Sequence, residues 1–202
     1  MAKRKLPLLA ERSIAEMKAK RLEIANSLDT KLRLVSCHAG CSACCSHPRY
    51  ISILEGMVLY QYLTAKGQWT PSLRAKLEEH ANQTFDLAAE VWLMLNLPCP
   101  VLDKGKCLAY EARPFSCRTI YATSDPLNCH PHRLTEARFV DRQAEIEKFR
   151  ETERKILARH RLALFGIPIS KAILLGEKIM SGEGDLEHFF ALAFESTQET
   201  KP

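Results

Sequence analysis

The cysteines constrain this chain of 202 residues more than any other feature. Four of its eight cysteines fall within the nine residues of CHAGCSACC, at 37–45, and the last two are neighbours. The first group is Cys37, Cys41, Cys44 and Cys45, and the second is Cys99, Cys107, Cys117 and Cys129. Thiolates separated by two or three residues can converge on one ion or cluster, so the first group predicts metal ligation.

The expected compartment decides how such thiols are used. The apolar stretch at residues 6–10 is too short for a signal peptide, and no run reaches the roughly 18 to 20 apolar residues of a membrane helix. We therefore expect a cytoplasmic protein with no membrane partner. Cytoplasmic thiols are kept reduced, which favours metal or redox chemistry over structural disulfides, and export would reverse that preference.

Helical periodicity predicts an all-α fold, a small helical domain with irregular cysteine-rich metal-binding loops between its helices. Ser13 with Glu16 has the form of a capping box, and Thr70 with Pro71 has the form of a helix start. No alternating run is long enough to predict a strand. The predicted helices cover residues 13–35, 53–66, 71–97 and 135–166, with two shorter helices starting near 170 and 185.

These signals divide the chain into three segments. Residues 1–36 form a basic amino-terminal helix, residues 37–134 a cysteine-cluster metal-binding core, and residues 135–202 a carboxy-terminal helical extension that packs on the core. Residues 98–134 hold five of the ten prolines and lack a sustained period. That stretch cannot bury much apolar surface, so we expect metal-thiolate bonds to hold it in place.

The excess positive charge lies in the first segment. Net charge is +5, and residues 1–36 carry nine Lys or Arg against four Asp or Glu, while the remainder balances at twenty against twenty. The basic helix at 3–33 is a candidate surface for a protein partner, although a solvated helix face explains the same charges. Because no aromatic residue interleaves it, we do not expect it to bind nucleic acid.

Adjacent cysteines limit how the thiols are shared. Their side chains diverge in most backbone conformations, so Cys44 and Cys45 are not expected to serve one tetrahedral ion together. We interpret CHAGCSACC as half of a bipartite metal centre, with Cys44 and Cys45 facing different ligand sets and the segment from Cys99 to Cys129 supplying the rest. Four histidines also lie close to cysteines and could substitute as ligands, His130 and His132 before the others. We favour surface or hydrogen-bonding roles for each of them: His38, His47, His130 and His132.

Spacing alone leaves the metal open between zinc and iron. Zinc sites usually repeat a Cys-x2-Cys knuckle, which this chain lacks, whereas three close cysteines and a distant one often hold a [4Fe-4S] cluster. An iron-sulfur cluster is therefore the expected cofactor and zinc the alternative. Radical S-adenosylmethionine enzymes share the Cys-x3-Cys-x2-Cys string, but here Ala43 replaces their aromatic residue and the strands of their barrel are missing.

Two motifs resemble the YkgJ-type cysteine-cluster proteins, whose shared domain is described as zinc- or iron-chelating. They are CHAGCSACC followed by ISILEG, and PCPVLDKGKCLAYEARPFSCR followed by Cys129. The resemblance spans about residues 37 to 130 and implies metal ligation by all eight cysteines. Flagellin lysine methylases share this core and pair an iron-sulfur centre with S-adenosylmethionine. Their extra sequence is absent here, so methylase activity is not implied.

The second motif also carries two arginines. Arg113 and Arg118 would lie near a centre that four thiolates leave net negative, so they can offset its charge or hold an anionic ligand. Pro114 can begin a short helix that presents Cys117, and Tyr110 can cover the metal from solvent.

The sequence thus predicts a cytoplasmic cysteine-ligated metalloprotein whose iron-sulfur cluster has a redox or group-transfer role. One alternative is a zinc-stapled helical module that binds a protein or nucleic-acid partner through its basic helix, and another is metal storage or delivery. The sequence contains no phosphate loop, nucleophile elbow or His-Glu-x-x-His helix. Whether the chain is an enzyme is left open.

Overall fold

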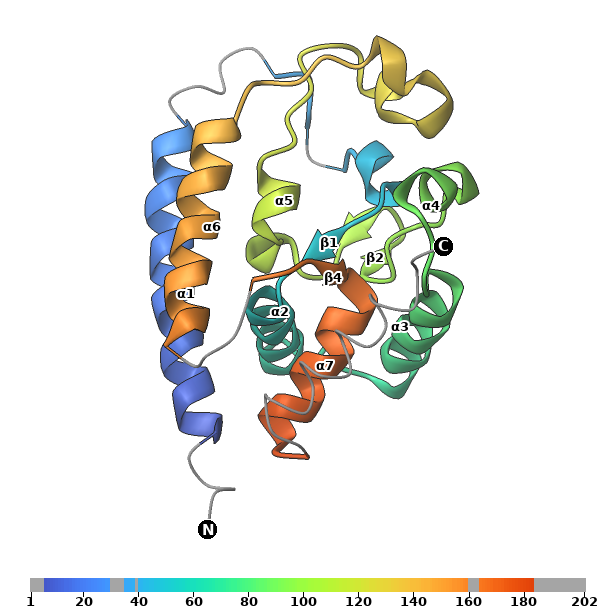
Figure 1. The fold of residues 1–202 in the computed structure, drawn as a ribbon. Helices are drawn as coiled ribbons and strands as arrows, with labels where there is room; N and C mark the ends of the chain where they lie inside the picture. The colour runs from blue at the N-terminus through green and yellow to red at the C-terminus, as the bar shows by residue number, and fades with distance from the viewer. Residues whose placement is uncertain (1–5, 30–34, 39, 160–163, 184–202) are drawn as a thin grey trace, which may run out of the picture.

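A computed structural model describes residues 6–29, 35–38, 40–159 and 164–183. In this part of the chain helices predominate, and the strands are four pieces of two residues each, which confirms the all-α prediction (Figure 1). The helices are α1 (Leu6–Asp29), α2 (Ile53–Ala65), α3 (Pro71–Gln83), α4 (Ala89–Leu95), α5 (Phe115–Arg118), α6 (Gln143–Ala158) and α7 (Ile169–Ser181). Short 3-10 helices are η1 (Ala43–Ser46), η2 (Tyr110–Ala112), η3 (Pro126–Cys129) and η4 (Pro131–Glu136).

The core forms where α2 and α7 cross with their backbones in contact. A Cβ atom on Gly56 of α2 would lie only 2.2 Å from the carbonyl oxygen of Ala172 in α7, so this crossing requires glycine. Figure 1 shows α3 on the other side of α7, which it contacts. Apolar side chains such as Leu63, Leu77 and Ile173 are completely buried between these helices, and their burial stabilises the arrangement.

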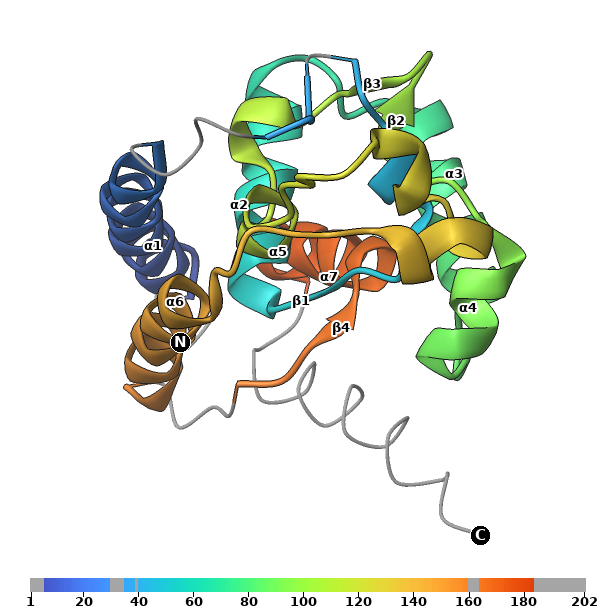
Figure 2. The same cartoon turned by 90° about the horizontal axis from the view of Figure 1, so that it is seen from above.

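Helices α1 and α6 lie side by side along one flank (Figure 2). Ile14 and Met17 of α1 are buried, as are Phe149 and Ile156 of α6. Arg21 of α1 donates hydrogen bonds to the backbone carbonyls of residues 112 and 113, at 2.9 and 3.1 Å. This flank is therefore fastened to the second cysteine segment.

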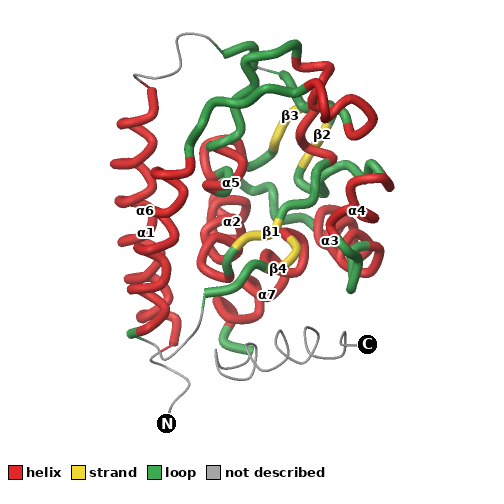
Figure 3. Tube along the Cα trace, turned by 45° about the horizontal axis from the view of Figure 1, so that its top comes forward, coloured by secondary structure: helices red, strands yellow, loops and turns green. Residues whose placement is uncertain are grey.

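Two small antiparallel ladders complete the fold (Figure 3). β1 (Tyr50–Ile51) pairs with β4 (Ile167–Pro168), and β2 (Leu102–Asp103) pairs with β3 (Lys106–Cys107). The second ladder is a tight hairpin whose two turn residues, Lys104 and Gly105, have positive φ angles of 47° and 75°. A two-residue turn with positive φ at both positions matches the twist of its flanking strands.

Several helix boundaries differ from the predictions, and among them α6 ends at Ala158, where the prediction extended to residue 166. α1 begins at Leu6, because Pro7 is tolerated in a first helical turn, and Ser13 is buried inside the helix. The helix expected over residues 71–97 is broken into α3 and α4, with Asp86 between them in a left-handed conformation, φ 53°. α6 begins at Gln143 because residues 131–136 form η4 instead.

Some predictions cannot be compared with the described residues. The helix expected near residue 185 lies outside the described residues, and the division into three segments stays a prediction. No helix in the described ranges is long and apolar enough to cross a membrane. The cytoplasmic location also stays a prediction.

The two cysteine segments meet on one face of the helices, although they are far apart in the sequence. The amide of Ser36 donates to the carbonyl of Ala122, and the amide of Cys99 donates to the carbonyl of Cys45, both at 2.8 Å. η1 also contacts η3. These contacts bring the cysteine-bearing loops together in the upper half of the molecule in the view of Figure 1.

Candidate metal centre

The first cysteine segment turns at Gly40 and ends in η1. Gly40 has a φ of 87°, which glycine adopts without steric cost. Across this turn the amide of Cys41 donates to the carbonyl of His38 at 3.1 Å. η1 then places Cys44 and Cys45 on one short helical turn.

Separate local structures position the cysteines of the second segment. The amide of Cys99 is tied to the first segment through Cys45, as described above. Cys107 lies in β3, opposite Leu102 of β2. Cys117 lies in α5, which begins directly after Pro114, as the sequence predicted.

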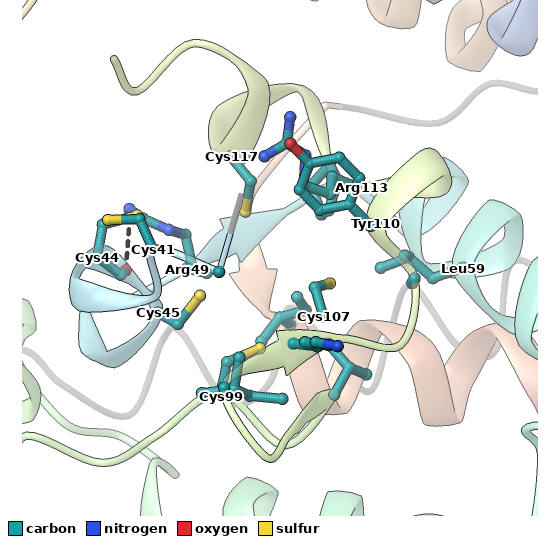
Figure 4. A pocket seen from close by; sticks show the side chains of 18 residues that line it. Cys41, Cys44, Cys45, Arg49, Leu59, Cys99, Cys107, Tyr110, Arg113 and Cys117 are labelled. Atoms are coloured by element: carbon teal, nitrogen blue, oxygen red, sulfur yellow. Dashed lines mark hydrogen bonds between the residues drawn. The ribbon is translucent and has the colours of Figure 1, made fainter. Parts of the chain in front are cut away.

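One pocket brings six cysteine side chains together. Its volume is about 350 Å³, and its walls include Cys41, Cys44, Cys45, Cys99, Cys107 and Cys117, besides apolar residues such as Leu59 and Ile169. Figure 4 shows Cys45, Cys99, Cys107 and Cys117 around the open space and Cys41 and Cys44 together at one side. In the described part of the chain no three His, Cys, Asp or Glu side chains are already arranged to hold a metal ion. Ligation therefore requires the thiols to move closer together than they are in this structure.

Two arginines bring positive charge to this pocket. Arg113 lines it, with its guanidinium stacked 4.0 Å from the ring centroid of Tyr110, another lining residue. Arg49 lines it as well and donates to the carbonyl of Cys44 at 3.0 Å. Arg118 is not among the described residues of the wall, and it donates to the carbonyl of Glu111.

Sequence reasoning missed Arg49. The available signal was its position four residues after Cys45, where a group of thiolates requires a counter-charge. The predicted counter-charges, Arg113 and Arg118, both come from the second motif.

Burial and charge act in opposite directions on the pocket thiols. Burial raises the pKa of Cys99 to about 12 and that of Cys117 to about 11, while Arg49 lowers both pKa values. The pKa of Cys44 falls to about 6, because its thiolate accepts a hydrogen bond from Cys45 and lies near Arg49. The same hydrogen bond raises the pKa of Cys45. Cys44 is thus the thiol most easily deprotonated of these four, and metal binding at the others must release protons.

Cys37 and Cys129 are not among the described residues of the pocket wall. The sulfur of Cys37 accepts a hydrogen bond from the amide of Ala122 at 3.2 Å. Cys129 is buried, and its carbonyl accepts a hydrogen bond from the ring of His47. Three other histidines beside cysteines are exposed: His38, His130 and His132.

The fold and the pocket together define a small helical protein whose loops gather thiols around a cavity. A family model named CxxCxxCC, with the description "Putative zinc- or iron-chelating domain", matches residues 36–154. The chain belongs to this family, which confirms the resemblance to the cysteine-cluster proteins. Three residues separate the first two cysteines in this chain, where the family name has two. No curated protein and no solved structure matches the chain.

Proposed function

We propose that the chain binds an iron-sulfur cluster in the six-cysteine pocket and that the cluster has a redox or group-transfer role. The observation that carries this proposal is that six cysteine side chains from both segments line one pocket. Four thiolates are the usual ligands of a [4Fe-4S] cluster, and this pocket supplies at least that number.

The proposed ligands are the four thiols around the open space: Cys45, Cys99, Cys107 and Cys117. Only Cys45 comes from the first group, so this set differs from the three close cysteines on which the spacing argument was based, and the shared pocket supports it instead. When bound, a cluster supplies one-electron transfer or an iron atom that accepts a ligand. Four thiolates make such a centre net negative, and the guanidinium groups of Arg49 and Arg113 offset that charge. The apolar side chains of Leu59, Val101 and Ile169 limit the access of water to the thiolates.

Backbone amides near the hairpin support thiolate ligation. The amide of Val101 lowers the pKa of Cys99, and the amide of Ala109 lowers the pKa of Cys107, each against a larger rise caused by burial. Each amide lies two residues after its cysteine. Hydrogen bonds from the backbone to thiolate sulfur stabilise the ligated form and tune the potential of iron-sulfur centres.

The family description also covers zinc, and a zinc-stapled module that binds a partner through the basic helix stays the alternative. Three cations of α1 contact other groups of the chain, however. Lys18 contacts Gln61, Lys20 pairs with Glu23, and Arg21 binds backbone carbonyls near Arg113. We therefore favour the pocket over the basic helix as the functional site.

The visible spectrum of anaerobically purified protein tests this proposal. We expect a brown protein whose absorption bleaches when dithionite is added, because thiolate-ligated iron clusters absorb in their oxidised state. Cys117→Ser should lose at least half of that absorption. Ser116→Ala, which changes the neighbouring residue and removes a hydroxyl without a hydrogen-bond partner among the described residues, should keep it.

Two outcomes count against the proposal. A colourless protein with tightly bound zinc would assign the pocket to zinc. A brown colour that survives in Cys99→Ser, Cys107→Ser and Cys117→Ser alike would place the cluster elsewhere.

A further inference from the structure

Another cavity lies beside the six-cysteine pocket, and the proposed metal centre does not use it. Its volume is about 520 Å³, against about 350 Å³ for the six-cysteine pocket. Parts of α2, α5 and α6 line it, together with β1 and residues 164–166. Arg49 borders both spaces, so the two are neighbours. Small-molecule sites have volumes of roughly 300 to 1,000 Å³, a range that includes this cavity.

Two buried carboxyl groups from different helices belong to the wall of this cavity. They are those of Glu55 in α2 and Glu153 in α6, and these residues are only 6% and 4% exposed. The hydroxyl of Ser52 donates to the carboxylate of Glu153 and accepts from the amide of Glu55 at 3.2 Å. The carboxylate of Glu55 accepts from the amide of Phe115 at 2.6 Å. Hydrogen bonds thus fix both side chains in the wall.

The carboxyl group of Glu153 is incompletely satisfied by the chain itself. Ser52 binds one of its oxygens, and the other has no hydrogen-bond partner among the described residues. Within the same described part of the chain, neither Glu153 nor Glu55 forms an ion pair. Burial and the negative charge of Glu55 raise the pKa of Glu153 well above its usual range. A buried acid without a counter-ion weakens the fold, so in a cavity it marks a candidate binding site.

The arginines around the cavity do not neutralise these acids. Those in its wall are Arg49, Arg150 and Arg154. Arg154 pairs with two glutamates of its own helix, and Arg49 donates to a backbone carbonyl of η1. Arg150 is exposed, and its charge lowers the pKa of Glu153 from a distance. Arg21 acts on Glu55 in the same way but is not among the described residues of the wall. The carboxyl groups therefore remain without a cation in contact.

Aromatic and aliphatic side chains provide an apolar surface in the same cavity. The rings of Phe115 and Phe149 are stacked, with centroids 4.3 Å apart and an interplanar angle of 16°. Both line the cavity, as do Ile146 and Leu164. Such side chains bind the apolar part of a ligand, while a few buried polar groups fix its orientation.

We propose that this cavity binds a small organic amine, with its ammonium group against Glu153 and Glu55 and its apolar part against Phe115 and Phe149. An ammonium group supplies both the hydrogen-bond donors and the positive charge that the two acids lack. The apolar surface distinguishes this site from one for a hydrated metal ion, which requires several oxygen ligands. The inference does not depend on which metal the six-cysteine pocket holds.

Titration of the full chain with benzylamine, followed by NMR, tests this site. Benzyl alcohol has nearly the same shape without the charge and is the matched ligand control. We expect wild type to bind benzylamine with a dissociation constant of about 1 mM or below, and benzyl alcohol about tenfold more weakly, because hydrogen bonds to charged groups are the stronger ones. Benzylamine should shift the resonances of Phe115 and Phe149, which report binding in the cavity.

Matched variants test the role of the buried charge. Glu153→Gln keeps the size of the side chain and an oxygen that accepts from Ser52, but it removes the charge. It should weaken benzylamine binding by about tenfold and leave the binding of benzyl alcohol unchanged. Glu78→Gln removes an equal charge from α3, which does not line the cavity, and should change neither affinity. Both variants should keep the visible absorption of wild type, so failure of this site is distinguishable from failure of the proposed function.

Several outcomes would overturn the amine site. They are the absence of saturable benzylamine binding, equal affinities of wild type for benzylamine and benzyl alcohol, and unchanged benzylamine binding in Glu153→Gln. Tighter binding of Nα-acetyl-lysinamide than of benzylamine would overturn the assignment to a free amine, because it would favour the side chain of a peptide. The comparison of benzylamine with benzyl alcohol uses wild type alone, so it decides the question even if Glu153→Gln fails to fold.

Discussion

At the scale of single residues, the charge of Arg49 acts on thiols of both cysteine segments. Its guanidinium lowers the pKa of Cys44 on the first segment and the pKa values of Cys99 and Cys117 on the second. A cation in this position stabilises thiolates, and it stabilises the reduced form of a cluster even more because that form carries an extra negative charge.

Replacing Arg49 should therefore shift the midpoint potential of the centre. We expect Arg49→Gln to lower the potential by about 50 mV, close to a tenfold change in a one-electron equilibrium. A redox titration followed by visible absorption measures this shift. Arg118→Gln is the matched control, since Arg118 is not among the described residues of the pocket wall. Equal midpoint potentials for wild type and Arg49→Gln would show that the charge of Arg49 does not act on the centre.

His80 makes stability depend on pH. The residue is buried, with its ring packed edge-on against Trp92 and its Nδ1 3.1 Å from the hydroxyl of Ser170. Burial lowers its pKa from 6.5 to about 4. Between these values the unfolded chain binds a proton that the folded chain does not, so the free energy of unfolding falls as the pH drops from 6.5 to about 4.

This titration predicts a difference between wild type and His80→Gln. The variant should be less stable than wild type at pH 7, and the gap between them should narrow by about 2 kcal/mol at pH 4.5. Urea unfolding at the two pH values measures the gap. A constant gap would mean that His80 does not account for acid sensitivity.

At the scale of elements, Arg21 holds α1 to the backbone of the second cysteine segment, while the rest of α1 contacts α2, α6 and α7. Arg21→Gln would leave backbone carbonyls near Arg113 without their charged donor, at a cost of about 2 kcal/mol in the free energy of unfolding. Lys20→Gln removes an equal charge from an exposed pair with Glu23 and should cost less than about 0.5 kcal/mol. Thermal or urea unfolding of both variants compares them, and equal losses would contradict this role of Arg21.

Local chemistry explains which helix ends the sequence could predict. Thr70 caps α3 as expected, and Ser52 caps α2 in the same way, because each side chain accepts a hydrogen bond from the amide three residues later. Ser13 has the same local signal but lies inside α1, so the signal alone does not stop a helix that can extend further. The left-handed residue at Asp86 interrupts a helical period that the apolar residues continue through.

The site was predictable in its chemistry more than in its arrangement. The spacing of the cysteines identified the donors, since spacing is a property of the sequence. Which thiols share a space depends on contacts such as that of the Cys99 amide with the Cys45 carbonyl, which no local pattern specifies. The pocket-lining role of Arg49 follows from the same long-range packing.

At the scale of the whole molecule, the core and the cysteine loops should respond differently to loss of metal. α2 and α7 pack through apolar contacts that do not involve thiols, whereas residues 119–130 bury little apolar surface. Chelation under reducing conditions should raise amide hydrogen exchange in residues 119–130 by about tenfold or more and leave α7 protected. Exchange measured by mass spectrometry resolves both regions. A uniform rise across the chain would show instead that the metal holds the entire fold together.

The central claim is that the six-cysteine pocket holds an iron-sulfur cluster. Acid-labile sulfide, counted together with iron and zinc in anaerobically purified wild-type protein, tests it most directly because only a cluster contains inorganic sulfide. The proposed function predicts sulfide and iron in equal amounts on the same chain, lost together in Cys107→Ser. Zinc bound at full occupancy with no sulfide would contradict it.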